Sequence, residues 1–226
     1  VVLRPSIKTS AYSMISAAAL VPYGSGEGES VSGEALDGKL PDGVRVTTKC
    51  RVGDTPAADI PTLLEGSLAS SLDRMKLKRV DVMFLHNWVT ADGAPTYDRG
   101  TPRSIVESAV IPTLQRFVDD GRIGGWGLTG IGDPTVLIAM LEAGAKPDYI
   151  QIMANLLDSP GGLKYPDGAA RPRDIIAAAQ QAGTSIMGIR AVQAGALTSA
   201  LDRPKPAENP ETLDFGRAAP FRAIAT

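Results

Sequence analysis

Several polar side chains that could do chemistry follow apolar, β-rich stretches of this sequence. Lys49 comes near the end of VRVTTKC, and the sole histidine, His86, directly follows VMFL. Thr129, Gln151 and Arg190 stand in comparable places further along. A lysine beside a phenol stabilises the phenolate, and a neutral imidazole can donate to a substrate oxygen or relay a proton. These residue types indicate proton transfer at an oxygen atom.

Tyr23 is the candidate acid, in the glycine-rich stretch VPYGSGEGES. The glycine after it would let the backbone turn and present the ring to a site. A phenol with a pKa of about 10 is a poor acid at neutral pH, so Tyr23 needs a cation such as Lys49 nearby. The stretch does not match a phosphate loop, because Glu29 replaces the last glycine of the Gly-x-Gly-x-x-Gly pattern and Glu27 and Glu29 would repel phosphate.

Each of these residues also has an ordinary structural role open to it. A lysine at a strand end can extend its ammonium to the surface, a lone histidine after an apolar strand often only completes a hydrogen bond, and most tyrosines only pack. Gln151 and Asn155 would share one face of a strand, where two amides need partners. A ligand amide or buried water could supply them.

The elements that carry these residues alternate between strand and helix. Apolar patterns predict strands at 44–50, 80–86, 123–130, 148–155 and 184–190, and helices at 60–75, 105–118 with a restart at Pro112, 134–143 and 172–182. Residues 203–212 read as a loop, and a last helix begins at Phe215. Repeated βαβ units mean a parallel sheet, in a Rossmann-like fold or a (β/α)₈ barrel. We favour the barrel, because there the carboxyl ends of the strands, which carry the polar residues, converge on one mouth.

The bulk properties indicate a single α/β domain over residues 1–226. The net charge of -2 gives no basic footprint for nucleic acid or a membrane surface, and no apolar run approaches a membrane span of about 20 residues. No signal peptide is visible, and the lone Cys50 favours a reducing compartment, so we expect a cytoplasmic protein. One histidine and one cysteine argue against zinc, and no metal is expected.

Six segments of the chain resemble the aldo-keto reductase superfamily, whose members are NADPH-dependent reductases on a (β/α)₈ barrel. PYGSGEGESVSGEAL resembles its tyrosine-glycine loop, VTTKC its strand with the catalytic lysine, and SSLDRMKLKRVDVMFLHN the helix and strand before its catalytic histidine. DDGRIGGWGLTG, DYIQIMANLLD and GTSIMGIRAVQAGALT resemble the next three βα segments. The match covers residues 11–225, and its strength lies in the joint order and spacing of the motifs.

The resemblance implies hydride transfer from a nicotinamide to a substrate carbonyl carbon. Tyr23 would protonate the oxygen, Lys49 would lower the pKa of Tyr23, and His86 would orient the carbonyl. The implied NADPH-binding residues are Thr129, Gly130, Gln151, Arg190, Ala191, Gly195 and Leu197. Thr129 and Gly130 replace the family's Ser-Asn pair, and Arg190 replaces an aromatic ring, which it could mimic by stacking its guanidinium plane. Asn87, Trp88 and Trp126 are candidate walls of a pocket for a small carbonyl or alcohol.

The chain also departs from the family pattern. Ala18 stands where the family has an aspartate, and SMISAAAL reads as a helix that runs straight into VPYG, so a strand is missing between Leu20 and Val21. The first and eighth strands are not recognisable either, which leaves an incomplete barrel. A barrel without three strands would expose sheet edges and core. We therefore expect that segments of a complete barrel are omitted from these residues, and not that the protein is a truncated homologue.

Three functions fit these observations. The first is an NADP(H)-dependent reductase of aldehydes or ketones, which the set of Tyr23, Lys49 and His86 favours. The second is a cofactor-binding regulatory or redox-sensing barrel with little turnover, which Ala18 and the replaced Ser-Asn pair favour. The third, an unrelated barrel lyase, would need another acid-base pair, and no such cluster stands out.

Overall fold

A curved parallel sheet forms the centre of the molecule. The computed structural model describes residues 2–3, 14–15, 26–95, 99–163, 168–198, 214 and 216–220. Its main strands are β3 (Arg45–Cys50), β4 (Val82–Leu85), β7 (Trp126–Thr129), β8 (Tyr149–Met153) and β9 (Ser185–Ile189). They lie side by side in the order β9-β8-β7-β4-β3, and all neighbours are parallel. The five strands predicted from the sequence are therefore confirmed.

Two short strands lie at the edges of this sheet. β1 (Val2–Leu3) pairs antiparallel with β9, and β2 (Met14–Ile15) pairs parallel with β3. The interpretation of SMISAAAL as a helix is wrong at Met14 and Ile15. A short apolar run does not by itself separate helix from strand. Here, pairing with β3 decides the matter.

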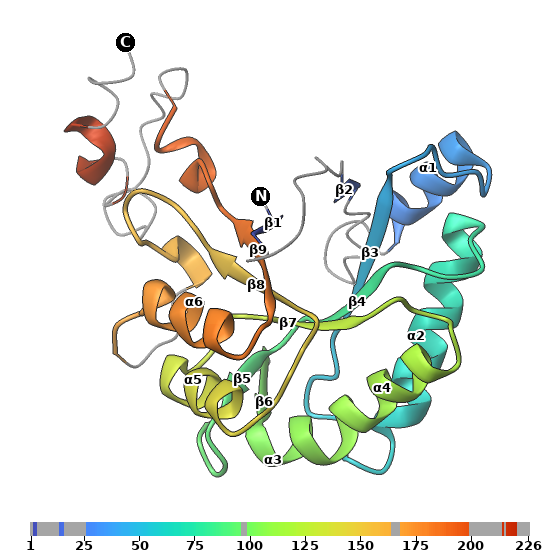
Figure 1. Cartoon of the computed structure of the whole chain (residues 1–226), viewed down its shortest axis with the longest axis horizontal. Coiled ribbons are helices and arrows are strands. Elements are labelled where there is room, and N and C mark those ends of the chain that lie inside the picture. Colours follow the sequence, from blue (N-terminus) through green and yellow to red (C-terminus); the bar gives the residue numbers. More distant parts are fainter. Residues whose placement is uncertain are drawn as a thin grey trace.

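The helices pack around the outside of the curved sheet (Figure 1). The predicted helices are present as α2 (Ile60–Met75), α5 (Pro134–Glu142) and α6 (Pro172–Gln181). The region from 103 to 119 is one helical stretch of α3 (Arg103–Ile105), a π-helical turn η2 (Val106–Val110) and α4 (Ile111–Asp119). The restart at Pro112 is confirmed, because this proline stands in the first turn of α4. Residues 216–220 are helical too.

The sequence suggested a loop for the glycine-rich stretch, but the structure is helical there from Glu27 onward. Residues from Glu27 onward form α1 (Glu27–Leu36), with Gly28, Glu29 and Gly33 inside it. Gly33 lets α1 approach α2, since a Cβ there would lie 2.0 Å from the carbonyl oxygen of Arg74. Packing on α2 thus overrides the low helix propensity of glycine.

Besides β1 and β2, four further short elements were not predicted. β5 (Trp88–Thr90) and β6 (Gly100–Pro102) pair with each other beyond β4, and η3 (Gly161–Leu163) and η4 (Gln193–Gly195) are single 3₁₀ turns after β8 and β9. Their three-residue lengths leave no periodic signal in the sequence. All four lie in the segments that follow carboxyl ends of main strands.

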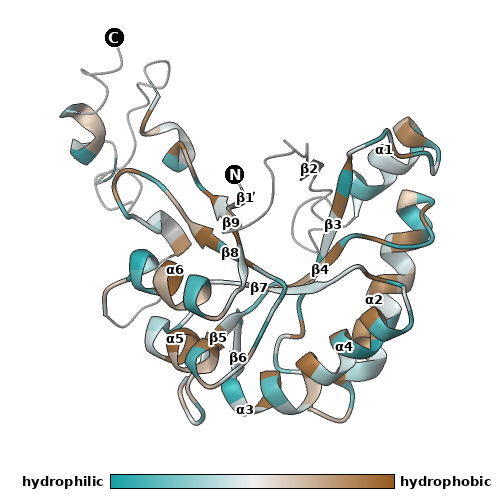
Figure 2. Cartoon of the chain, viewed as in Figure 1, coloured by the Kyte–Doolittle hydropathy of each residue, from teal (hydrophilic) through white to brown (hydrophobic). Residues whose placement is uncertain are grey.

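The sheet has two faces with different neighbours. On one face, the main core joins strand residues such as Met83, Leu85 and Ile150 to helix residues such as Leu64 and Leu137. Apolar and polar residues recur in turn along the helices that cover the sheet (Figure 2). The other face, here called the inner face, carries a smaller apolar cluster formed by Val82, Phe84 and Met187 with Tyr149 packed against it.

The architecture is that of an incomplete (β/α)₈ barrel: a curled parallel sheet with helices on its outside. This confirms the fold class, and with it the expectation that the polar residues at the carboxyl ends of the strands share one edge. Within the described residues, the structure contains no helix that combines the length and apolarity needed to cross a membrane.

Candidate active site

Lys49 and His86 come from adjacent strands at the carboxyl edge of the sheet. Lys49 pairs in register with Phe84, and Cys50 pairs with Leu85. The pairing continues past the strand end, where the backbone N–H of His86 donates to the carbonyl oxygen of Cys50 over 2.7 Å. By strand alternation, Lys49 and Phe84 face the inner side, because Cys50 and Leu85 belong to the core under the helices.

The charge state of each of the two residues is shaped by burial. Burial lowers the pKa of the half-buried Lys49 ammonium. Burial, and then the positive charges of Lys49, Arg51 and Arg99, lower the pKa of His86 from 6.5 to about 4. The imidazole is therefore neutral at neutral pH, so that one ring nitrogen is a donor and the other an acceptor.

Thr129 and Gln151 lie next to each other in β7 and β8, in register. The Thr129 hydroxyl is buried and donates to the carbonyl oxygen of Leu85 over 3.0 Å, which ties β7 to β4. Gln151 is 3% exposed, and its Nε2 donates to the Sδ of Met187 over 3.0 Å. Gly130 packs closely beside them, since a Cβ there would lie 2.8 Å from the carbonyl oxygen of Gln151.

The three residues expected to line a substrate pocket occupy different environments. Trp126 is the first residue of β7 and lies in the core under the helices, at the end of the strand away from Thr129. Asn87 is buried, and its amide accepts from Val52 N over 3.0 Å and donates to Arg99 O over 3.4 Å. Trp88 is half-buried in β5, directly after the His86–Asn87 pair. Of the three, Trp88 has the position best suited to a pocket wall.

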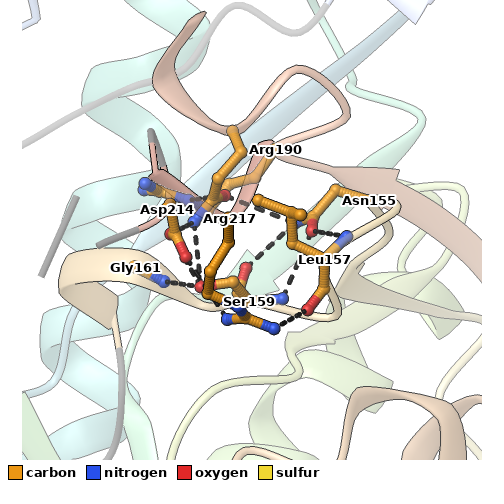
Figure 3. A network of polar contacts seen from close by, with 8 residues as sticks. Asn155, Leu157, Ser159, Gly161, Arg190, Asp214 and Arg217 are labelled. Atoms are coloured by element: carbon orange, nitrogen blue, oxygen red, sulfur yellow. Dashed lines mark hydrogen bonds and ion pairs between the residues drawn. The ribbon is translucent and has the colours of Figure 1, made fainter. Parts of the chain in front are cut away.

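The loop after β9 begins with Arg190 in a left-handed conformation, with φ of 57°. Its Nε donates to Oε1 of Gln193 over 2.9 Å, one of several polar contacts in this region (Figure 3). Ala191 is exposed and Gly195 is buried. Leu197 packs on a small cluster that includes Leu157. Arg190 is thus held in place by its own loop.

Gln193 is a residue that sequence reasoning missed, although it contacts Arg190 directly. It is 1% exposed in η4, and the chain places it three positions after Arg190. The signal in the sequence was weak, because a glutamine in a loop is usually solvated. A positive φ of 45° at this non-glycine residue marks the strained turn that buries it.

Glu29 is a second missed residue, since the sequence suggested only a loop position for it. Its carboxylate is fully buried; it accepts from the Thr48 hydroxyl over 2.8 Å and pairs with the Arg74 guanidinium over 2.6 Å. Thr48 directly precedes Lys49, so Glu29 ties α1 to the strand that carries Lys49.

Two residues named from the sequence, Tyr23 and Ala18, lie outside the described residues. Among the residues that are described, no group of three His, Cys, Asp or Glu side chains could hold a metal ion. What the structure brings together is a half-buried ammonium, a neutral imidazole and two buried polar side chains on one edge of the sheet. Such a set can orient a polar oxygen and support proton transfer.

The chain was compared with models of known protein families and with known proteins. The Aldo/keto reductase family model matches residues 9–221. No curated protein matches the chain.

Solved structures share the fold. Glycerol dehydrogenase AKR11B4 from Gluconobacter oxydans has a TM-score of 0.63 at 19% identity over 94% of this chain and 63% of its own. An aldo/keto reductase from Klebsiella pneumoniae, in complex with NADP and acetate, has a TM-score of 0.54 at 22% identity over 83% of this chain and 56% of its own. Bombyx mori AKR2E4, in complex with NADP, has a TM-score of 0.54 at 18% identity over 87% of this chain and 58% of its own. The chain thus spans less than two thirds of the length of each of these structures.

Proposed function

The chain belongs to the aldo/keto reductase family, and from this premise we propose that it is an NADP(H)-dependent oxidoreductase that reduces an aldehyde or ketone to an alcohol, or catalyses the reverse. The observation that carries the proposal is the placement of Lys49 beside a neutral His86 at the carboxyl edge of β3 and β4. Family members with these residue types use them at a carbonyl oxygen, as the sequence resemblance implies.

The residues present fit a nicotinamide cofactor. Gln151 is buried on the inner face with a thioether as the acceptor of its amide, a weak partner that a carboxamide oxygen could replace. Arg190 offers a planar cation at the same edge. Thr129, Gly130, Ala191, Gly195 and Leu197 complete the proposed binding residues. When bound, NADPH supplies the hydride that reduces the carbonyl carbon.

The side chains of this protein manage the oxygen and the proton. We infer that His86, neutral at pH 7, donates its ring N–H to the carbonyl oxygen and orients it. Tyr23 gives its proton to that oxygen, which completes the alcohol. The Lys49 ammonium favours the tyrosinate that remains and so lowers the pKa of Tyr23.

We propose a small-molecule carbonyl or alcohol as the substrate, with Trp88 as the most suitable pocket wall, and a cytoplasmic location. The location rests on Cys50, which is buried and free, as is usual in a reducing compartment. Neither nucleic acid nor membrane is a proposed partner, given the net charge of -2.

A second candidate, a cofactor-binding regulatory barrel with little turnover, is favoured by one observation. The Thr129 hydroxyl donates to the main chain of Leu85, so its proton is already engaged and it can offer a cofactor amide only an acceptor. A carboxamide held by fewer donors could still bind, with its ring less well aligned for hydride transfer.

Turnover with NADPH and a panel of aldehydes and ketones, followed by the loss of nicotinamide absorbance, separates the two candidates. For Tyr23→Phe we expect reduction to fall by at least about 100-fold while NADPH binding stays unchanged, because the change removes the proton donor alone. Tyr149→Phe is the control, because this tyrosine is the first residue of β8 and so lies toward the amino edge of the sheet, away from His86. NADPH binding without turnover in the wild type would favour the regulatory barrel, and equal loss of binding and reduction in Tyr23→Phe would make Tyr23 structural.

A further inference from the structure

A buried polar cluster joins three segments that are distant in the sequence (Figure 3). Asp214 is 2% exposed, and its Oδ2 accepts from the Ser159 hydroxyl over 2.7 Å and from Nε2 of Gln193 over 2.6 Å. Ser159 follows β8, Gln193 follows β9, and Asp214 lies just before the helical residues 216–220. The C-terminal segment thus reaches into the loops at the carboxyl edge of the sheet.

The contact with Asp214 fixes the orientation of the Gln193 amide. A carboxylate only accepts, so it selects the NH₂ end of the amide, which also donates to Ser159 Oγ over 3.3 Å. The oxygen end of Gln193 must then point the other way. There it accepts from Arg190 Nε over 2.9 Å and from Nδ2 of Asn155 over 3.3 Å.

The surroundings leave the amide little freedom to flip. A Cβ on Gly161 would lie 2.7 Å from Nε2 of Gln193 and 2.8 Å from a terminal nitrogen of Arg190, so both side chains pack tightly against this glycine. The charge of Asp214 is balanced by Arg217, 3.5 Å away, which also donates to the carbonyl oxygen of Leu157 over 2.9 Å. A reversed Gln193 would set its oxygen against the carboxylate and its NH₂ against the guanidinium.

We propose that Gln193 and Asp214 are positioning residues for Arg190: Asp214 orients the Gln193 amide, and the amide oxygen holds the guanidinium in the plane that receives the cofactor. The inference rests on the proposed function, since it assumes that Arg190 contacts NADP(H). It assigns to a residue of the C-terminal segment a part in cofactor binding through a relay of two hydrogen bonds.

Loss of this relay has a definite consequence. Without the Gln193 oxygen, Arg190 loses a contact that helps to fix its rotamer, and ordering it again on binding costs affinity. The cost should appear in the dissociation constant for NADPH, and it should vanish when Arg190 is absent. A purely structural role would instead weaken binding to the same degree whether or not Arg190 is present.

The test measures NADPH dissociation constants by fluorescence titration for the wild type, Gln193→Met, Arg190→Ala and the double variant, with melting temperatures alongside. Methionine keeps the length of glutamine without its polar ends. We expect Gln193→Met to weaken NADPH binding about tenfold and the double variant to bind like Arg190→Ala alone. Thr113→Ala, which removes a buried hydroxyl bonded to Ala109 O within the 103–119 helical stretch, is the control for lost stability and should leave the constant unchanged.

Asp214→Asn tests the first step of the relay, because an amide at this place no longer selects one end of Gln193. We expect an intermediate loss of affinity that likewise disappears in the Arg190→Ala background. Should Gln193→Met fail to fold, Gln193→Asn serves in its place, since its amide is too short to reach both Asp214 and Arg190. The inference would be overturned if the fold-changes of the two single variants in the NADPH dissociation constant multiplied in the double variant. It would also be overturned if Gln193→Met left this dissociation constant unchanged. Absence of NADPH binding in the wild type would instead overturn the proposed function itself.

Discussion

The properties of His86 depend on its neighbours more than on its residue type. The sequence marks it as the sole histidine after an apolar strand, and this position at the carboxyl edge is confirmed. Its neutrality comes from burial and from the charges of Lys49 and Arg51, 37 and 35 positions earlier, and of Arg99, 13 positions later. Only a neutral ring can offer both a donor and an acceptor at pH 7.

The lowered pKa of His86 predicts a pH-dependent stability. Its pKa is about 4 in the folded protein and 6.5 when unfolded, so between these values the unfolded state binds more protons. The contribution of a neutral His86 to folding stability is therefore fully present above pH 6.5 and is lost as the pH falls toward 4. We expect a loss of roughly 2 kcal/mol, allowing for partial solvent screening, measured by urea unfolding across this range.

His86→Asn provides the comparison, because asparagine does not titrate. The unfolding free energy of the wild type minus that of the variant should fall as the pH falls from 7 to 4. A constant difference over this range would mean that His86 has an ordinary pKa in the folded protein.

At the scale of elements, α1 shows how a helix is held by a single buried charge. The carboxylate of Glu29 in α1 meets the Arg74 guanidinium near the end of α2 and the Thr48 hydroxyl in β3. Sequence reasoning took the surrounding glycines for a loop, because it weighed their propensity and not the partner that α1 finds in α2. The helices α2, α5 and α6 were predictable, since apolar residues recur along them at helical spacing and proline stands in the first turn of each.

Glu29→Ala should destabilise the protein by about 3 kcal/mol, because it leaves the buried Thr48 hydroxyl and the Arg74 cation without their acceptor. Urea unfolding at pH 7 measures the effect. Glu34→Ala, an exposed glutamate in the same helix, is the matched control and should change stability by less than about 0.5 kcal/mol. Equal unfolding midpoints for the two variants would show that the buried ion pair contributes nothing to folding.

At the scale of the whole molecule, the sheet is curled but not closed by its five main strands, with two-residue strands at both edges. The predicted order of strands and helices is confirmed. That the chain is a single domain over residues 1–226 stays a prediction, as do the roles of the site residues. The proposed cofactor would bridge the edge of the sheet from Gln151 in β8 to Arg190 after β9, and so couple separate loops.

This coupling predicts a stabilising effect of the cofactor. A ligand that binds only the folded state adds about 2.7 kcal/mol at 100 times its dissociation constant. For a chain of 226 residues we expect the melting temperature to rise by about 5–10 °C with NADPH, as measured by circular dichroism. Arg190→Ala should need more NADPH for the same rise. A melting temperature that ignores NADPH up to millimolar concentration would contradict the proposed cofactor.

The sequence by itself determined the order of the strands and helices, placed Lys49, His86, Thr129 and Arg190 at or next to strand ends, and placed Gln151 within a strand, because apolar periodicity and punctuation by glycine and proline are local properties of the chain. The tertiary structure decided that Glu29 meets Arg74, 45 positions away, and that Asp214 meets Ser159, 55 positions away. It also decided that Trp126 packs in the core and not at the site. Such contacts follow from how distant segments pack, and burial and neighbouring charges then set the chemistry of each side chain.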